Sequence, residues 1–261
     1  AEICDDFRWI GLCKLGRAIR YFRQHGVTEA SMLGKIHKVV LFQPWRWFRH
    51  LPDLVTIRTF LPHFLTKQKD CKDDTLLSAV VATFAAGGIR FAPATDYAPK
   101  LLVPAGQLTR RGPSPGQWKD ICFGWQIAKE LGRLDIGQSV AVKDQAVLAL
   151  EAVEGTDQCI ARAGELCRIG DFTVVKVAKP QQDMRFDVPT IGTGTLETIR
   201  RAGGRALAVE AHRTIVLDHD KVVQVADRHG LVIVSLEEQD GLPTLHEFDS
   251  HRTPVAGSPV Q

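Results

Sequence analysis

Residues 172–195 read FTVVKVAKPQQDMRFDVPTIGTGT, an apolar run followed by a charged stretch and a Gly-rich turn. The run of Val that ends at the Lys179-Pro180 step is typical of a buried strand, because proline pushes the residue before it into extended backbone. Polar residues that follow such a strand lie where an α/β sheet binds ligands. The charged stretch is therefore a candidate site, and it supplies Lys176, Lys179, Asp183, Arg185 and Asp187.

Length and composition limit the class of protein. The chain has 261 residues, 44% of them apolar and 24% charged, which suits one large domain or two modest ones. A net charge of +3 does not favour bulk nucleic-acid binding. The six cysteines form no CxxC pair, so we expect reduced core thiols in a cytosolic protein. No signal peptide and no apolar run long enough to span a bilayer is evident.

The first half of the chain alternates strand and helix patterns. Helical spacing at 14–26 and 74–88, with strand-like runs at 28–33 and 89–93, predicts a parallel sheet. The opening residues resemble the middle of a sheet, so we expect an earlier part of this domain to be missing. Residues 104–117 are rich in Pro and Gly and predict a linker.

A separate apolar pattern lies within residues 42–65. Positions 54, 57, 61, 64 and 65 share one helical face, and Trp and Arg cluster just before it. The spacing favours a helix that faces the core. The alternative is contact with a membrane surface or an acyl chain.

The second half predicts a mixed α/β domain. We expect two strands in a hairpin, a strand at 172–179, two strands that pair with each other at 206–211 and 214–218, and a last strand at 231–236. Helices are expected at 118–132, 158–167 and 195–202 and after Asp218. Polar composition predicts a disordered tail at 237–261.

The charged stretch itself has two interpretations. Asp183 and Asp187 lie four residues apart with Arg185 between them, a combination that can bind a divalent cation and a phosphate together. The same residues also suit a loop of surface ion pairs, and the two interpretations carry about equal weight.

Four further segments are candidates of lower specificity. LDIGQSV at 134–140 offers Asp135 and Gln138 beside a Gly, or only a turn. EAVEGTD at 151–157 offers Glu151, Glu154 and Asp157 as oxygen donors for Mg²⁺, although we favour Thr156 or Asp157 as a helix cap. IGTGT at 191–195 suits a helix start better than a phosphate loop. GKIHK at 34–38 offers Lys35, His37 and Lys38 to a phosphate or uracil, and a solvated loop is an interpretation of about equal weight.

Several motifs occur together in an order that identifies a family. They are AxMLGKIHKxxLF at 30–42, KDDTLL at 72–77, GQLTRRGPS at 106–114, LDIGQSVAVKD at 134–144, LALEAVEGTD at 148–157 and KVAKPxQDMRFDVPTIG at 176–192. Over residues 5–236 the chain resembles the LpxI type of UDP-2,3-diacylglucosamine pyrophosphatase, a bacterial enzyme of lipid A biosynthesis. The GLIAGNGxLP segment with which family members begin is absent from the sequence.

The resemblance implies a fold, a reaction and a location. The fold is α/β with two α/β domains, the first a Rossmann-like parallel sheet lacking its first strand and the second a mixed sheet. Their expected limits are 1–108 and 118–236, joined by a linker at 109–117, with the lipid held between them. The implied reaction is Mg²⁺- or Mn²⁺-dependent hydrolysis of UDP-2,3-diacylglucosamine to UMP and 2,3-diacylglucosamine 1-phosphate. The expected location is the cytoplasm, peripheral to the inner membrane, with a homodimer as a further expectation.

The matched motifs carry these roles to particular residues. We expect catalytic roles for Asp187, Asp183 and Arg185. Substrate-binding roles are expected for Lys35, His37, Thr109, Arg110, Gln138, Thr156, Lys176, Lys179 and Gln182. Metal ligands are expected among Asp187, Asp183, Glu154, Asp157 and Asp135.

Two other classes of function compete with this enzyme. One is a non-catalytic protein that binds a nucleotide- or phosphosugar-lipid, favoured by the absent first segment. The other is a Rossmann dehydrogenase, which ranks last because no GxGxxG follows any strand pattern in the chain.

Overall fold

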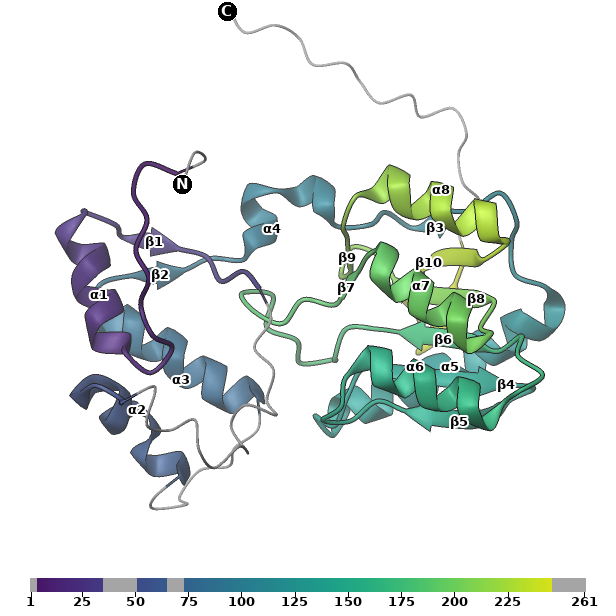
Figure 1. Cartoon of the computed structure of the whole chain (residues 1–261), viewed down its shortest axis with the longest axis horizontal. Coiled ribbons are helices and arrows are strands. Elements are labelled where there is room, and N and C mark those ends of the chain that lie inside the picture. Colours follow the sequence, from purple (N-terminus) through teal and green to yellow (C-terminus); the bar gives the residue numbers. More distant parts are fainter. Residues whose placement is uncertain (1–3, 35–50, 65–72, 246–261) are drawn as a thin grey trace, which may run out of the picture. The chain divides into compact units, whose positions relative to one another are not determined.

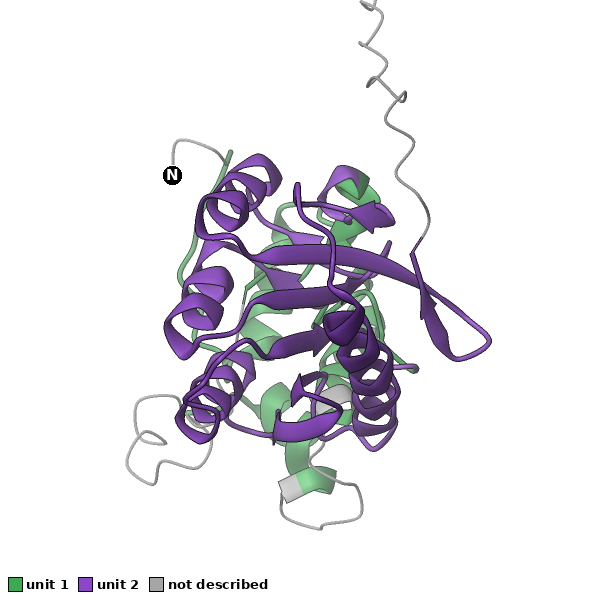
Figure 2. Cartoon of the chain, turned by 90° about the vertical axis from the view of Figure 1, so that its right-hand side faces the viewer, with its two compact units in different colours: residues 1–99, 181–188 green, residues 100–180, 189–261 purple. Residues whose placement is uncertain are grey.

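The computed structural model describes residues 4–34, 51–64 and 73–245. The chain divides into two compact units, shown in green and purple in Figure 2. Unit 1 comprises residues 1–99 and 181–188, and unit 2 comprises residues 100–180 and 189–261. The chain therefore passes between units at 99/100, 180/181 and 188/189, whereas the sequence analysis placed one boundary at 109–117.

Unit 1 is a small α/β unit in which helices pack on a two-stranded parallel sheet. Strand β1 (Glu29–Ala30) pairs with β2 (Arg90–Phe91) in parallel, as the sequence predicted. The described helices are α1 (Leu15–Gln24), α2 (Leu54–Phe64), α3 (Asp73–Ala86) and α4 (Ala94–Tyr97), labelled in Figure 1. Its apolar core includes Ile19, Phe84 and Ile89, and Phe186 joins this core from the 181–188 segment.

Helix α2 corrects one prediction of the sequence analysis. The apolar positions expected to face the core are exposed where they are described, with 84% exposure at Leu54, 41% at Ile57 and 40% at Leu61. The buried face carries Thr56 and His63 instead. Asp53 accepts hydrogen bonds from the Thr56 N–H at 2.9 Å and from the Arg17 N–H of α1 at 3.0 Å. The helix does face the unit 1 core, but through Val55 and Phe60 rather than through the predicted positions.

Unit 2 is built on a mixed sheet with strand order β11-β10-β8-β6-β4-β5, and β3 pairs with β10. The three central strands are β6 (Thr173–Lys176), β8 (Ala206–Glu210) and β10 (Val232–Gln239), and they run parallel. Strand β4 (Ser139–Lys143) is antiparallel to β6 and forms the expected hairpin with β5 (Ala146–Leu150). The remaining strands are β3 (Gly106–Gln107), β7 (Thr190–Ile191), β9 (Ile215–Val216) and β11 (Leu242–Thr244).

Helices cover both faces of the unit 2 sheet. Helix α5 (Pro115–Arg133) packs Ile121, Trp125 and Ala128 against one face. The second apolar cluster contains residues of α6 (Thr156–Leu166), α7 (Thr193–Ala202) and α8 (His219–His229) together with the alternate residues of the same strands. Strand β6 is buried throughout because it is covered on both sides, which explains the apolar run that opened the sequence analysis.

The start of α5 shows why the Pro- and Gly-rich run belongs to unit 2. Ser114 and Gln117 form a capping box, and Pro115 occupies the first turn, where its missing N–H has no cost. Within α5, a Cβ on Gly124 would lie 2.9 Å from Val175 Cγ2, so the glycine lets the helix approach the sheet closely. A short η3 turn (Pro99–Leu101) precedes this region.

Two details of the second half differ from the predictions. The strands expected to pair with each other do not, because β8 is bordered on both edges by β6 and β10, and β9 pairs with β7. Residues 237–245, predicted as the start of a disordered tail, complete β10 and form β11, with Glu237 opposite Thr244.

Candidate functional site

The candidate site of unit 2 lies at one edge of its sheet, which we call the carboxyl edge. It is the edge where β5, β6 and β8 end and β4 begins. The strand register places Ser139 opposite Lys176, and Lys176 opposite Val209. The opposite edge, where β6 and β8 begin, is called the amino edge. Ligands of open α/β sheets bind at carboxyl ends of strands, so polar side chains at the carboxyl edge are the first to consider.

A buried hydrogen-bonded chain runs along the carboxyl edge from β6 to the end of β5. The Lys176 ammonium donates to Thr156 Oγ1 at 3.0 Å, and Thr156 Oγ1 donates to Glu151 Oε1 at 3.0 Å. The Ser139 hydroxyl lies 3.4 Å from the same Thr156 oxygen. All four residues are buried. The sequence analysis expected Lys176 and Thr156 to bind substrate, and the structure brings them together.

The favoured interpretation of Thr156 or Asp157 as a helix cap is wrong. Helix α6 has Gly155 as its N-cap, with a φ of 86°, and no side chain caps it. The Thr156 hydroxyl instead belongs to the buried chain described above.

Two acceptor oxygens at the carboxyl edge are buried without a hydrogen-bond partner in the described part of the structure. They are Gln138 Oε1 and Glu151 Oε2. An unsatisfied buried acceptor costs about 1–3 kcal/mol, so native proteins keep few of them. A ligand group with N–H or O–H donors, or ordered water, would remove this cost.

A second buried lysine, Lys179, follows Lys176 closely in the sequence. Lys179 Nζ pairs with Asp135 Oδ1 at 2.5 Å, and both side chains are almost fully buried. Asp135 has a φ of 55°, a region that non-Gly residues rarely occupy. Thus the motifs at 134–140 and 176–192, which were far apart in sequence, meet at one pair of charges.

Glu210 is a residue that the sequence analysis missed. It ends the buried strand β8, and its carboxylate accepts from the Ala178 N–H at 2.8 Å and from Lys129 Nζ at 2.8 Å. Arg213 also contacts Glu210 at 3.4 Å and donates to the Lys179 carbonyl at 3.2 Å. These bonds hold the backbone that carries Lys179. The available signal was a charged residue at the carboxyl end of an apolar strand.

The 181–188 segment belongs to unit 1 and contains the three predicted catalytic residues. Arg185 binds Asp183 through a fork of bonds, with Nε at 2.9 and 3.0 Å and Nη2 at 2.5 Å from the carboxylate oxygens. The hydrogen bonds from Arg185 lower the pKa of Asp183, despite partial burial that acts in the opposite direction. Buried Gln182 donates to the Phe186 carbonyl at 3.4 Å. The ion-pair interpretation of this stretch therefore holds for Asp183 and Arg185.

Asp187 differs from its neighbours in this segment. Its side chain is exposed, and its backbone has a φ of 56°. Left-handed backbone at a non-Gly residue costs about 1–3 kcal/mol and is found often at active sites. Asp and Asn are the residues that accept this conformation most readily after Gly, so the position suits an Asp that must project a carboxylate.

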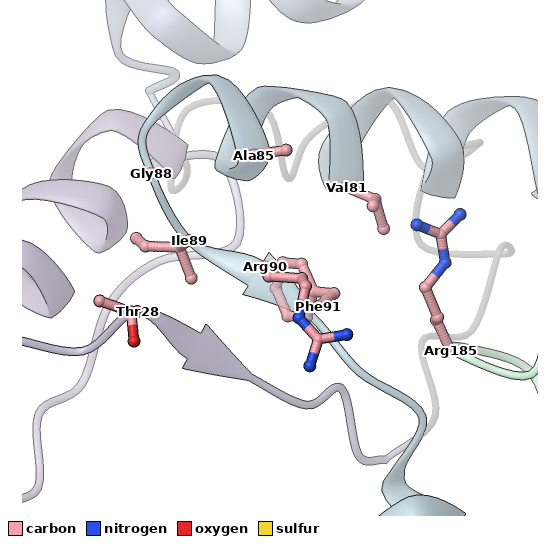
Figure 3. A pocket seen from close by; sticks show the side chains of 8 residues that line it. All are labelled: Thr28, Val81, Ala85, Gly88, Ile89, Arg90, Phe91 and Arg185. Carbon is pink, nitrogen blue, oxygen red and sulfur yellow. The ribbon is translucent and has the colours of Figure 1, made fainter.

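A pocket of about 200 Å³ in unit 1 adjoins Arg185. Figure 3 shows that α3 and the β1 and β2 strands surround it, with Arg185 beside α3. Its apolar lining includes Val81, Ile89 and Phe91, and Arg90 contributes a second guanidinium. Arg90 is paired with Glu29, as Arg185 is with Asp183, so both cations of the pocket already have an anionic partner.

Thr109 and Arg110, also expected to bind substrate, lie at the amino edge. Thr109 Oγ1 accepts from the Ile233 N–H at 2.9 Å near the start of β10. The Arg110 N–H donates to Asp227 Oδ1 of α8 at 2.9 Å, and its exposed side chain lines a surface pocket of about 290 Å³. The structure therefore does not bring these two residues together with Lys176. Their role in substrate binding stays a prediction.

The carboxylates expected to hold a metal are already engaged or dispersed. Asp135 pairs with Lys179, Asp183 with Arg185, and Glu154 with Arg162 at 2.9 Å. Asp157 is exposed on the first turn of α6. Over residues 4–34, 51–64 and 73–245, no group of three or more His, Cys, Asp or Glu is placed as a metal site requires. The described residues of each unit therefore do not fit a protein-built Mg²⁺ or Mn²⁺ site.

Three remaining predictions concern other parts of the chain. Lys35 and His37 lie outside the described residues. The Gly-rich turn at 191–195 is a helix start, as favoured, since α7 begins at Thr193 after an N-cap at Gly192. Buried Cys159 of α6 has its thiol pKa raised to about 12 by burial and by the charge of Glu151, so it is an inert core thiol.

Two consecutive family models together match most of the chain. Residues 1–101 match the LpxI N-terminal domain, and residues 104–234 match the LpxI C-terminal domain. The chain belongs to the LpxI family. UDP-2,3-diacylglucosamine pyrophosphatase LpxI of Caulobacter vibrioides is 30% identical over 243 residues, which cover 88% of this chain and 82% of that protein.

Membership of the LpxI family confirms the resemblance drawn from the motifs. The buried lysines and the acceptors of the carboxyl edge lie inside the matched LpxI C-terminal domain. The segment with Asp183, Arg185 and Asp187 also lies within that match, although it packs in unit 1. Among the described helices, none combines the length and the apolar composition needed to cross a bilayer.

Proposed function

We propose that this LpxI-family protein hydrolyses the pyrophosphate bond of UDP-2,3-diacylglucosamine, giving UMP and 2,3-diacylglucosamine 1-phosphate for lipid A biosynthesis. The observation that carries the proposal is the buried pair Lys176 and Lys179 at the carboxyl edge of a chain 30% identical to a protein named for this activity. Buried cations at strand ends are suited to a doubly charged phosphoanhydride.

The chemistry assigns separate roles to the cations and the carboxylate. Water attacks the α-phosphorus, its oxygen becomes part of UMP, and the bond from the α-phosphorus to the bridging oxygen breaks. The bridging oxygen stays on the β-phosphorus, and the leaving group is the sugar 1-phosphate. Lys176 and Lys179 counter the charge that develops on the phosphoryl oxygens. Asp187 orients the water and accepts its proton, which needs an exposed carboxylate within reach of solvent.

The test is release of UMP from UDP-2,3-diacylglucosamine in detergent micelles by the purified chain. Asp187→Asn is expected to lower turnover by at least ~10²-fold, the usual contribution of general base catalysis. Asp240→Asn is the matched control, since Asp240 is also exposed and has a φ of 52°. Near-normal turnover by Asp187→Asn would defeat the assigned role.

An isotope experiment separates this reaction from its alternatives. In H₂¹⁸O, mass spectrometry should find one heavy oxygen in UMP and none in the sugar phosphate. Label in the sugar phosphate would mean attack at the β-phosphorus. Binding of the substrate without any release of UMP would favour the non-catalytic binding protein instead.

Dependence of the activity on Mg²⁺ or Mn²⁺ is also proposed, on the basis of the family resemblance. Because the described carboxylates do not form a metal site, we expect the ion to bind together with the substrate. Mg²⁺ is commonly held by substrate phosphates with one or two carboxylates. We expect the purified protein to carry less than one ion per chain by elemental analysis, and EDTA to stop UMP release until Mg²⁺ is added back. Stoichiometric metal in the isolated protein would contradict this expectation.

Location in the cytoplasm, peripheral to the inner membrane, is also proposed, and helix α2 supports it. Leu54, Ile57 and Leu61 expose one apolar face beside Arg58, a combination that suits the interface of an anionic bilayer. Replacement of Leu54 and Leu61 by Ser should reduce co-sedimentation with vesicles that contain anionic phospholipid. Ile169→Ser, which removes from unit 2 an apolar side chain as exposed as Leu54, is the control. A homodimer stays a prediction.

A further inference from the structure

We propose that Glu151 is a positioning residue for Lys176, acting through the Thr156 hydroxyl. The inference rests on the proposed function, because it concerns how the lysine meets the phosphoryl oxygens. Glu151 lies outside the residues to which the LpxI resemblance gave a role.

The direction of each bond in the chain is fixed by chemistry. An ammonium is only a donor and an ionised carboxylate only an acceptor, while a hydroxyl has one proton to donate. Lys176 Nζ donates to Thr156 Oγ1, so the proton of Thr156 is directed to Glu151 Oε1, each at 3.0 Å. Ser139, at 3.4 Å, can then act only as a donor to Thr156. The carboxylate therefore orients the hydroxyl, and the oriented hydroxyl places the ammonium.

Backbone contacts fix both ends of this chain. Glu151 N–H donates to the Ser139 carbonyl at 2.9 Å, which ties the end of β5 to the start of β4. A Cβ on Gly137 would lie 2.2 Å from the Glu151 carbonyl oxygen, so only glycine permits this close approach. Thr156 is held on the first turn of α6 behind Gly155. Because Glu151 and Thr156 are both held by regular secondary structure, the position of the Lys176 ammonium that binds Thr156 is restricted as well.

The unsatisfied oxygens show that this chain is more than a stabilising contact. A network selected only for stability would satisfy both oxygens of a buried carboxylate. Here Glu151 Oε2 and the nearby Gln138 Oε1 lack a hydrogen-bond partner in the described structure, although each atom is buried. Both acceptors lie at the edge where Lys176 ends its strand. A bound group with N–H or O–H donors would satisfy both acceptors, as would ordered water, and this property favours a ligand site.

The experiment compares variants that differ by one hydroxyl or one charge. Thr156→Val keeps the shape but removes the bond, and Glu151→Gln keeps the shape but removes the charge. Each is expected to lower kcat and kcat/KM by on the order of tenfold to a hundredfold, the usual cost of a misplaced catalytic group. Thr156→Ser restores the hydroxyl and should recover most of the loss. The double variant should be little worse than either single one, because both break the same chain.

A matched control separates positioning from burial. Thr173 on the same strand is fully buried, and its hydroxyl has no hydrogen-bond partner in the described structure. Thr173→Val should leave kcat and KM near those of the wild type. Urea unfolding of every variant confirms that the compared proteins are folded.

The affinity for UDP, measured by calorimetry, keeps the inference distinct from the proposed function. If the wild type releases no UMP, the proposed reaction is wrong. A weaker affinity for UDP in Thr156→Val that is restored in Thr156→Ser would still support the positioning of Lys176 through Thr156. If the wild type is active and Glu151→Gln matches it in turnover and UDP affinity, the inference is overturned. Additive losses in the double variant would overturn it as well.

Discussion

Lys176 and Lys143 lie on neighbouring strands of unit 2, at opposite edges of the same sheet. Lys143 ends β4 at the amino edge and donates to the backbone carbonyl of Asp171 at 3.0 Å, with its side chain 20% exposed. Lys176 ends β6 at the carboxyl edge and is only 6% exposed. It donates to Thr156 Oγ1 within the buried hydrogen-bonded chain. The first lysine binds the backbone of the fold, whereas the second belongs to the side-chain network for which we propose a role in binding the substrate.

The same contrast holds for the acidic residues of the two edges. Buried Asp120 at the amino edge accepts from the Asp144 and Gln145 N–H groups, at 3.2 and 2.6 Å. Both turn residues have positive φ, so the carboxylate stabilises a tight hairpin turn. Glu151 at the carboxyl edge keeps one oxygen without a partner. The carboxylate of Asp120 therefore stabilises the backbone, whereas the unsatisfied oxygen of Glu151 is open to a donor from a ligand or from water.

The largest effect should come from the two lysines. Lys176→Met is expected to lower turnover by ~10²–10³-fold, because it removes the buried charge that, in the proposed function, counters the phosphoryl charge. Lys143→Met should keep near-normal turnover, since Lys143 donates to the carbonyl and the carboxylate of Asp171 at the amino edge. Steady-state UMP release measures both. Equal losses in the two variants would erase the distinction between the edges.

Asp120→Ala should affect stability rather than turnover. The free energy of unfolding is expected to fall by ~2–3 kcal/mol, because two backbone N–H groups lose a charged acceptor. Urea titration followed by circular dichroism measures the change, and UMP release per folded molecule should be unchanged. A large loss of turnover in a folded variant would count against a purely structural amino edge.

Thr109→Val is a sharper test, because the motif containing Thr109 was expected to bind substrate. The structure predicts a loss of about 1–2 kcal/mol in unfolding free energy as the Ile233 N–H loses its acceptor. The KM for UDP-2,3-diacylglucosamine should not change. A raised KM would restore Thr109 to the site and move part of the site to the amino edge.

The smallest effect concerns pH and Glu238, near the carboxyl edge. Burial alone would raise the pKa of Glu238, but bonds from Lys129 and Trp125 and the charges of Lys129 and Arg213 outweigh it and lower the pKa below 4.5. A lowered pKa contributes stability above the ordinary value, and that stability is lost as the pH falls through the folded-state pKa.

Glu238→Gln should therefore cost at most about 1 kcal/mol at pH 7, as for a partly exposed ion pair. The difference from the wild type should shrink toward zero as the pH falls below 4.5, followed by urea unfolding across pH. A difference that grows in acid would mean that the sign of the pKa shift is wrong.

Much of the fold could be predicted because local patterns encode it. The apolar run of β6 and the helical spacing of α1, α3 and α5 were sufficient to place these elements. Pairing was harder, since the run at 214–218 follows β8 closely in sequence but joins β7 in space. Helix α2 failed for a related reason, because spacing identifies an apolar face without indicating what lies against it.

Most residues of the candidate site could be predicted from the sequence, but the contacts between them could not. Lys176, Lys179, Asp135 and Thr156 were all candidates, yet only the folded chain shows that Lys179 meets Asp135 and that Lys176 meets Thr156. Glu210 was missed because its partners, Lys129 and the Ala178 N–H, are distant in sequence. Long-range pairs of this kind depend on strand order, which no local pattern specifies.

The return of residues 181–188 to unit 1 has a consequence for synthesis of the chain. Phe186 is buried in the core of unit 1 with Ile19, Phe84 and Phe91, yet it leaves the ribosome long after them. The first unit therefore cannot complete its core until much of the second has been translated. A cut at 99/100 would leave residues 1–99 without the 181–188 segment of their unit, whereas residues 100–261 would keep all of unit 2. Residues 1–99 alone should therefore not be recoverable as a stable fragment, so the stability of unit 1 depends on translation of the chain through residue 188.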